Sequence, residues 1–180
     1  MDFIRYSKKK VDSEYLNPLF DRIRYKEEKM ISLEPMQQKD YDQVIEKEIR
    51  NYAADHVRNG NWPEEGSLER SRKEFETLLA DGIHTKDQYV WSLVDENRKI
   101  GFLWVQVKDS KAFIYDFLIK EEFRGKGYGK QALAAMDERL KSMNVASVAL
   151  HVFGDNITAQ ELYKKMGFEV TGIHMQKKYR

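Results

Sequence analysis

The sequence predicts an α/β (α+β) fold whose central strands form an antiparallel meander. Three observations indicate this class. Three β-rich runs follow one another across short polar turns, as in an antiparallel meander. Elsewhere, apolar residues recur at the spacing of amphipathic helices. The third run leads into a glycine-rich loop, residues 124–129, and then into a helix.

The first elements lie before the meander. A strand is predicted over residues 31–35, and a helix follows in which Asp40 and Gln43 form a capping box. Ser67 is expected to cap a second helix that ends near Ala80. The loop between these helices contains Trp62.

The remaining elements follow from the same patterns. The meander strands are predicted at residues 88–94, 100–107 and 112–119. After the glycine loop come a helix, a short strand at residues 147–153, and a helix whose apolar residues are Ala159, Leu162, Tyr163 and Met166. Residues 168–170 and 173–179 are predicted to form a final hairpin. The expected order is β-α-α-β-β-β-α-β-α-β-β.

Composition limits the classes of function. The 180 residues include no cysteine, which excludes disulfides, thiolate zinc sites and a cysteine nucleophile and agrees with a cytoplasmic location. Lysine plus arginine (31) and aspartate plus glutamate (30) nearly cancel, which argues against binding to duplex nucleic acid. No apolar run approaches the roughly 20 residues of a membrane span. The expected protein is cytoplasmic and a monomer or homodimer, without nucleic-acid or membrane partners.

Residues 1–29 differ from the rest of the chain. They contain the run Lys8-Lys9-Lys10 and few periodic apolar positions. We therefore predict an N-terminal extension or arm at residues 1–29 and one domain at residues 30–180.

The glycine loop reads Arg-Gly-Lys-Gly-Tyr-Gly from Arg124 to Gly129. Its glycines permit close approach of a ligand to the backbone, and the following helix directs unpaired N–H groups at the same point. This arrangement favours a phosphate or pyrophosphate. Two other phosphate loops are excluded, because Lys130 is followed by Gln131 rather than Ser or Thr, and because the glycine spacing differs from the dinucleotide fingerprint.

Two motifs together resemble the GNAT superfamily of N-acetyltransferases. The pattern Arg-x-x-Gly-x-Gly is similar to the family's acyl-coenzyme A loop, and a second segment about thirty residues later matches Asn-x-x-Ala-x-x-Leu-Tyr-x-x-x-Gly-Phe. That segment comprises Asn156, Ala159, Leu162, Tyr163, Gly167 and Phe168. The resemblance covers residues 30–180. It implies a GNAT-type mixed, mostly antiparallel central sheet with helices on both faces. In this sheet the strand before the loop and the strand after the long helix run parallel and splay apart around acetyl-coenzyme A.

The resemblance also implies a set of cofactor-binding residues. These are Phe117, Leu118, Ile119, Arg124, Gly125, Lys126, Gly127, Tyr128, Gly129, Lys130, Asn156, Ala159 and Tyr163. Phe117, Leu118 and Ile119 are equally compatible with a simple core strand. Asn156 is equally suited to cap a helix.

Acetyl transfer to an amine needs a proton acceptor, an oxyanion donor and a proton donor. The resemblance assigns the oxyanion donor to the Phe117 N–H and the proton donor to Tyr163, for which core packing is the alternative. The family's glutamate on the strand before the loop is replaced by Phe113. Asp116 is a candidate acceptor, and a structural role in a salt bridge or near a turn is the equal alternative. We expect its side chain on the face of Ile114 and Leu118. The other candidates are Glu48, Tyr52 and His56, or water relayed from Glu64 and Glu65.

The loop with Trp62, Glu64 and Glu65 is expected to be solvated, and a pocket for a cationic amine is the alternative. The four histidines are scattered, so no metal site is predicted. The leading hypothesis is an N-acetyltransferase that carries acetyl from acetyl-coenzyme A to a primary amine of a small molecule, peptide or protein. The alternatives are a transferase for a longer acyl group and a non-catalytic acyl-coenzyme A binding module.

Overall fold

The computed structural model describes residues 31–177 and residue 179. The arm predicted at residues 1–29 lies outside these residues. The strands are β1 (Ser32–Pro35), β2 (Gln88–Asp95), β3 (Arg98–Lys108), β4 (Lys111–Ile119) and β5 (Ser147–Leu150). The helices are α1 (Gln38–Arg58), α2 (Ser67–Leu78), α3 (Tyr128–Ser142) and α4 (Ile157–Lys165), with short 3-10 helices at Gly82–His84 and Glu121–Phe123.

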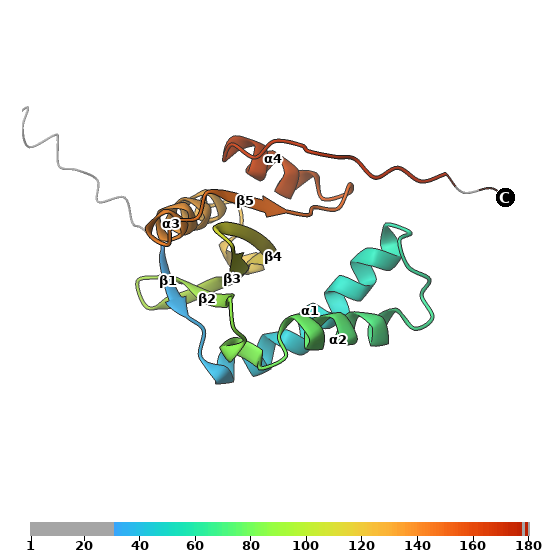
Figure 1. Cartoon of the computed structure of the whole chain (residues 1–180), viewed down its shortest axis with the longest axis horizontal. Helices are drawn as coiled ribbons and strands as arrows, with labels where there is room; N and C mark the ends of the chain where they lie inside the picture. Colours follow the sequence, from blue (N-terminus) through green and yellow to red (C-terminus); the bar gives the residue numbers. More distant parts are fainter. Residues whose placement is uncertain (1–30, 178, 180) are drawn as a thin grey trace, which may run out of the picture.

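The five strands form one sheet in sequence order, β1-β2-β3-β4-β5. The first four are antiparallel neighbours, which confirms the predicted meander, and β4 and β5 are parallel. Helices cover both faces: α1 and α2 lie on one side, and α3 lies on the other with α4 beyond β5 (Figure 1). The predicted mixed sheet with helices on both faces is therefore confirmed.

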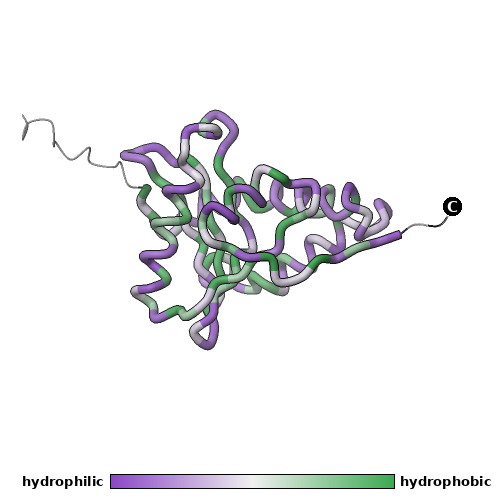
Figure 2. Tube along the Cα trace, turned by 90° about the horizontal axis from the view of Figure 1, so that it is seen from above, coloured by the Kyte–Doolittle hydropathy of each residue, from purple (hydrophilic) through white to green (hydrophobic). Residues whose placement is uncertain are grey.

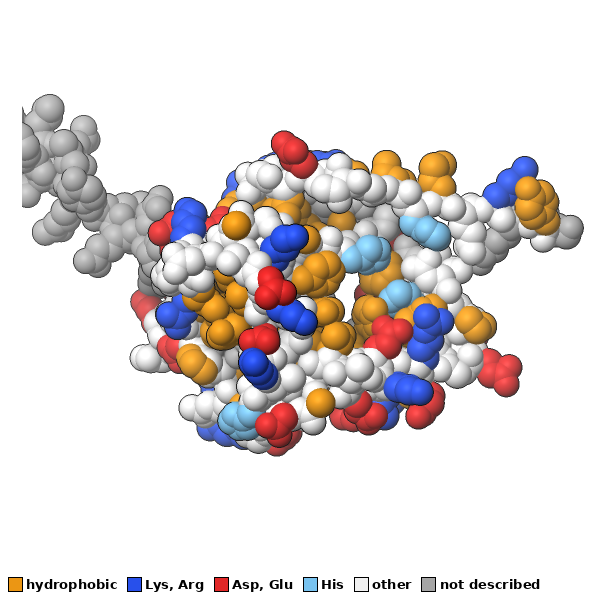
Figure 3. Space-filling model, viewed as in Figure 1, with side chains coloured by type: hydrophobic (Ala, Val, Ile, Leu, Met, Phe, Trp, Pro, Cys, Tyr) orange, Lys and Arg blue, Asp and Glu red, His pale blue; other side chains and the backbone are white. Residues whose placement is uncertain are grey.

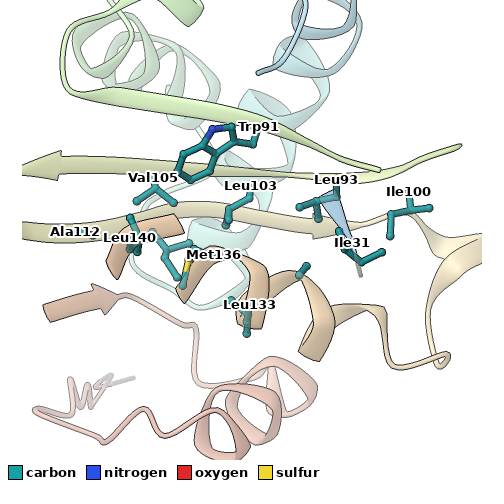
Figure 4. Packing of buried hydrophobic residues seen from close by; sticks show 12 residues of the cluster. Ile31, Trp91, Leu93, Ile100, Leu103, Val105, Ala112, Leu133, Met136 and Leu140 are labelled. Carbon is teal, nitrogen blue, oxygen red and sulfur yellow. The ribbon is translucent and has the colours of Figure 1, made fainter. Parts of the chain in front are cut away.

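Each face of the sheet has its own apolar cluster. On one face, α3 contributes Ala132, Leu133, Met136 and Leu140, all buried at helical spacing, and these pack on Leu103 and its neighbours (Figure 4). On the other face, Ile49 of α1 and Phe75 of α2 pack on Trp104. Hydrophobic residues accordingly follow the strands through the middle of the chain, while the tips of the turns are hydrophilic (Figure 2).

Gly101 is required where β3 pairs with the end of β4, opposite Ile119. A Cβ atom at this position would lie 2.0 Å from the carbonyl oxygen of Leu118 and 3.1 Å from the Cα of Ile119. Neither contact can be relieved by rotating a side chain, because both atoms belong to the backbone. Only glycine lets the two strands approach so closely here.

Two helix starts differ from the sequence prediction. Asp40 lies in the first turn of α1 rather than at its cap, which is Gln37, and its carboxylate pairs with Lys99 Nζ at 2.6 Å. The cap of α2 is Gly66, with φ of +74°, and Ser67 is the first helical residue. In both cases the helix extends one or more residues beyond the predicted start.

The predicted C-terminal hairpin is wrong. Residues 168–177 form no strand, and the chain leaves the body as an extended segment after Gly167 (Figure 1). The exposed fractions of Val170, Ile173 and Met175 are 67%, 80% and 86%. An isolated two-stranded hairpin is marginal without a surface to cover, and β5, its expected neighbour, has only four residues. Within the described residues, no helix is long and apolar enough to cross a membrane.

Candidate active site

A large cleft separates α1 and α2 from the glycine loop and α4. Its walls come from the outer half of β4, the start of α3, the loop after β5, and the inner faces of α1, α2 and α4. Figure 3 shows the molecule hollowed near its middle, with hydrophobic and histidine side chains around the rim. Every residue predicted to bind the cofactor lines this cleft, except Lys126.

The cleft exists because β4 and β5 separate. Their pairing covers four residue pairs and ends at Ile114 and Leu150, whereas β4 continues to Ile119. The outer part of β4 therefore presents backbone groups to the cleft rather than to β5. This is the splayed parallel pair that the sequence predicted.

The glycine loop turns the chain sharply into α3. Gly125 and Gly127 have φ values of +74° and +82°, which favour glycine, and Gly127 is the N-cap of the helix. The N–H groups of Gly125, Lys126, Gly127 and Gly129 donate to no backbone carbonyl of the described chain. Together with the N-terminal dipole of α3, these amides form a site suited to an anionic group.

Three side chains hold the loop in place rather than extending from it. Arg124 Nε donates to the carbonyl of Ile119 at 2.9 Å, and Lys126 Nζ donates to the carbonyl of Glu122 at 2.8 Å. The hydroxyl of Tyr128 donates to the buried carboxylate of Asp95 at 2.7 Å. These contacts tie the loop to the end of β4 and to the β2–β3 turn, an anchor that the sequence analysis missed.

The second motif lies on the loop before α4 and on the helix itself. Asn156 Oδ1 accepts from the N–H of Ala159 at 3.1 Å, so Asn156 caps the helix. This cap uses only the carbonyl oxygen of the side chain. Gly129 allows α3 to approach α4, because a Cβ there would lie 3.0 Å from Leu162 Cδ2.

A β-bulge determines which face of the sheet Asp116 occupies. The β3–β4 register shifts between Trp104, opposite Asp116, and Val105, opposite Ile114, which leaves Tyr115 as the extra residue. Ile114 packs in the cluster under α3, whereas Tyr115 packs with the α1 and α2 cluster and Asp116 lines a small cavity on that same side. Asp116 thus shares a face with Leu118, as predicted, but not with Ile114.

Asp116 and Glu48 both line this small cavity and the large cleft. Burial and, to a smaller extent, the charge of Glu48 raise the pKa of Asp116 to about 8, against the opposing effect of the hydrogen bond from the backbone N–H of Phe117. Burial likewise raises the pKa of Glu48, a residue that is only 7% exposed. Glu48 Oε2 accepts one hydrogen bond, from Asn51 Nδ2 at 3.2 Å.

Tyr163 faces the cleft from α4. Its ring packs on Phe168, with the ring centroids 5.5 Å apart, and on the cluster under α3. Burial, with a smaller contribution from the charge of Asp116, raises its pKa to about 12. The phenol therefore keeps its proton at neutral pH and lies within the electrostatic influence of Asp116. The predicted core packing and a position in the cleft are both observed.

The side of the cleft formed by α1 is rich in aromatic rings. Tyr52 contacts His56 edge to face, with centroids 4.4 Å apart, and His56 stacks on Trp62 at 3.9 Å. Phe153, in the loop after β5, contacts His56 edge to face, with the ring centroids 5.0 Å apart. Burial lowers the pKa of His56, which keeps the imidazole neutral near pH 7.

The expected solvated loop is confirmed for Glu64 and Glu65, and the alternative, an amine pocket of Trp62, Glu64 and Glu65, is wrong. Trp62 is buried at 6% exposure and serves as the platform for His56, while Glu64 and Glu65 are exposed and do not line the cleft. The carboxylates that do line its α1 and α2 walls are Glu48, Asp55 and Glu74. Helical packing turns these three inward, whereas the loop directs its glutamates to solvent.

An ionic bridge joins the two sides of the cleft at its mouth. Arg58 Nε contacts Asp155 Oδ2 at 2.6 Å, and Asn59 Nδ2 donates to Asp155 Oδ1 at 3.1 Å. Arg58 also pairs with Asp55 at 2.8 Å. This bridge connects the end of α1 to the loop before α4. In the part of the chain described, no group of three or more His, Asp or Glu side chains is arranged to hold a metal ion.

Comparison with known proteins identifies related sequences. The model of the Acetyltransferase (GNAT) family matches residues 51–168. The chain is 39% identical over 153 residues to an uncharacterized N-acetyltransferase of Bacillus subtilis, YycN, covering 82% of this chain and 98% of YycN. A second uncharacterized N-acetyltransferase of Bacillus subtilis, YdgE, is 34% identical over 151 residues, covering 81% and 96% of the two chains.

Solved structures agree with this match. The crystal structure of Bacillus subtilis YycN superposes with a TM-score of 0.80, covering 83% of this chain and 99% of YycN. PaiA N-acetyltransferase from Thermoplasma acidophilum, in complex with coenzyme A, superposes with a TM-score of 0.61 at 21% identity, covering 80% and 92% of the two chains. At that identity the likeness concerns the fold alone.

Proposed function

This chain belongs to the GNAT family and is an acetyl-coenzyme A dependent N-acetyltransferase, and we propose that its acceptor is a primary amine that attacks the acetyl group directly. The observation that carries the proposal is the convergence of Asp116, the Phe117 N–H and Tyr163 where β4 and β5 separate. These groups supply a proton acceptor, a hydrogen-bond donor and a proton donor. No covalent intermediate on the enzyme is needed.

The cofactor side fits coenzyme A. The four loop amides and the dipole of α3 would hold the pyrophosphate, with Lys130 nearby as an exposed cation. The unpaired edge of β4 at Phe117, Leu118 and Ile119 would pair with the amides of the pantetheine arm, which removes the cost of leaving buried peptide groups unbonded. Asn156 and Ala159 line the same path from α4. When bound, acetyl-coenzyme A supplies an activated acetyl thioester.

The three site groups divide the chemistry. Asp116 takes a proton from the incoming ammonium, since a carboxylate with a pKa of about 8 is a stronger base than an ordinary aspartate. The Phe117 N–H stabilises negative charge on the carbonyl oxygen. Tyr163, with a pKa of about 12, keeps its proton until a thiolate needs it. Glu48, Tyr52 and His56, the other base candidates, also line the cleft, whereas Glu64 and Glu65 do not.

The test is release of free thiol from acetyl-coenzyme A in the presence of alkylamines, polyamines, amino acids, aminoglycosides and peptide N-termini. We expect thiol release that depends on an amine and forms the corresponding acetamide, detected by mass spectrometry. Faster turnover with a longer acyl-coenzyme A than with acetyl-coenzyme A would identify the longer acyl group as the one transferred. Binding of acetyl-coenzyme A without turnover of any acceptor would contradict the proposal.

A further inference from the structure

The acceptor side of the cleft contains two acidic side chains, Glu48 and Asp116, that form no ion pair with a described residue. Glu48 is more than nine-tenths buried, its Oε2 accepts only from the neutral amide of Asn51, and its Oε1 has no described partner. Asp116 lies within the influence of the Glu48 charge, and neither carboxyl forms an ion pair with a residue that the structure describes. Buried carboxylates in proteins are normally paired with a cation. Without such a partner, burial raises the pKa of both carboxyls and favours their protonated forms. A ligand ammonium bound between them would supply the cation that their ionised forms need.

A second negative site lies farther along the same helix. Glu48, Tyr52 and Asp55 follow one another at i, i+4 and i+7 on α1, so they share one face, and all three line the cleft. Asp55 and Asp155 share the single guanidinium of Arg58 at the mouth. Two carboxylates against one guanidinium leave one negative charge. The other acid of this wall, Glu74, is already paired with Arg70 at 3.4 Å.

The space between the two negative sites is aromatic. Tyr52 and His56 lie on α1 between Glu48 and the mouth, and the ring of Phe153, from the loop after β5, contacts His56 edge to face. Aromatic faces accept the methylene groups of an alkyl chain and attract ammonium groups. Of the cations that line the cleft, Arg58 is paired with Asp55 and Asp155, and the others belong to the glycine loop and the helices that follow it: Arg124, Lys130 and Lys165. The acceptor side therefore suits a slender cation and disfavours an anion.

We propose that the acceptor is a linear diamine or polyamine, whose reacting ammonium binds between Glu48 and Asp116 and whose distal ammonium binds at Asp55 and Asp155. This inference rests on the proposed function. The two acids on α1 are seven residues apart, a rise of about 10 Å along the helix. A hydrogen bond at one end accounts for about 3 Å of this span. A chain of about five methylene groups between the two nitrogens covers the rest.

The protons balance in this arrangement. The reacting ammonium begins with three protons and keeps one as the amide N–H of the product. One proton passes to Asp116 and then to solvent, which frees the nitrogen lone pair for attack. The C–N bond forms and the C–S bond breaks. The last nitrogen proton restores Tyr163 after its phenol has protonated the departing thiolate.

The test compares three acceptors of matched length: 1,5-diaminopentane, pentylamine and 5-aminopentanoate. Thiol release from acetyl-coenzyme A is followed with the full chain. We expect kcat/KM to fall in that order, with the diamine at least tenfold better than pentylamine and the aminocarboxylate poorest. Comparable rates for the diamine and the aminocarboxylate would overturn the inference. Absence of thiol release with every acceptor would overturn the proposed function and, with it, this inference.

Variants then locate the two ammonium sites. Glu48→Gln should raise KM for the diamine at least tenfold while kcat changes by less than threefold. Asp55→Asn should reduce the preference for the diamine over pentylamine several-fold. Glu65→Gln, on the exposed loop, is the matched control and should leave both quantities unchanged. Coenzyme A affinity, measured by calorimetry, checks that each variant is folded. Unchanged diamine kinetics in both Glu48→Gln and Asp55→Asn, with normal cofactor binding, would refute the two sites.

Discussion

On the cofactor side of the cleft, two short segments present mainly backbone amides, whereas on the acceptor side α1, α2, β4 and the loop after β5 present side chains. The cofactor side depends on glycines with positive φ and on the start of one helix. The acceptor side depends on Glu48, Asp116 and a set of aromatic rings brought together by packing. The difference shows that one active site can combine a locally encoded half with a half encoded only by the fold.

This comparison predicts that changes on the two sides separate cleanly in kinetics. Changes to the loop should weaken cofactor affinity, and changes to the reacting groups should lower turnover. Three variants test the division, in decreasing order of expected effect.

Tyr163→Phe removes the proton donor and preserves the ring that packs on Phe168. We expect kcat to fall about 10²–10³-fold, because positioned acid catalysis contributes on this scale, while the coenzyme A dissociation constant stays within threefold. Tyr89→Phe is the matched control, since Tyr89 stacks on Trp91 outside the cleft. An unchanged kcat in Tyr163→Phe would assign Tyr163 to the core alone.

Asp116→Asn should lower kcat/KM about 10²-fold and remove a step from its pH profile. A base works when deprotonated, so with a pKa of about 8 the activity of the parent enzyme should rise with pH and level off above pH 8. Glu48→Gln should move this step to lower pH, because the charge of Glu48 raises the pKa of Asp116. Asp137→Asn, on α3 outside the cleft, is the control. A profile unaffected by Asp116→Asn would exclude Asp116 as the base.

The same raised pKa affects stability. Because the folded protein holds the Asp116 proton more tightly than the unfolded chain, this group stabilises the fold most at low pH and loses that contribution as pH rises through about 8. Urea unfolding should therefore show a smaller decline in the free energy of unfolding between about pH 4 and 8 for Asp116→Asn than for the parent.

Gly127→Val should weaken coenzyme A binding at least tenfold, because valine disfavours a φ of +82° and the loop amides would be displaced. Gly66→Val is a close control: Gly66 also caps a helix at positive φ with open space around it, but it lies outside the cleft. Calorimetric titration with coenzyme A compares the two. Equal affinities in both variants would count against the loop as the pyrophosphate site.

The cofactor side of the cleft could be predicted from the sequence much better than the acceptor side. The glycine loop and the Asn156 segment were recognisable because each is a contiguous motif, and the meander was recognisable from its short turns. The face occupied by Asp116 was not, because the bulge at Tyr115 arises from pairing with β3. Likewise, the final hairpin was inferred from local β propensity alone, with no surface in the fold to support it.

The acids of the acceptor side were missed for a similar reason. Glu64 and Glu65 stand beside a tryptophan in sequence, yet the side chains that face the cleft come from helices. One signal was available: Glu48, Tyr52 and Asp55 form a polar line along the otherwise apolar face of α1. A polar line on a packed helix face indicates a cavity, but only the fold shows what lies opposite.

Gly101 has a consequence for interpreting libraries of random variants. It lies outside the cleft, but any side chain there would push β3 away from Leu118 and Ile119, on the stretch of β4 that borders the cofactor path. Selection for activity should therefore deplete all replacements at Gly101 as strongly as replacements of reacting groups. A map of intolerant positions would therefore mark Gly101 as if it were a catalytic residue, although its role is to let β3 pack against β4.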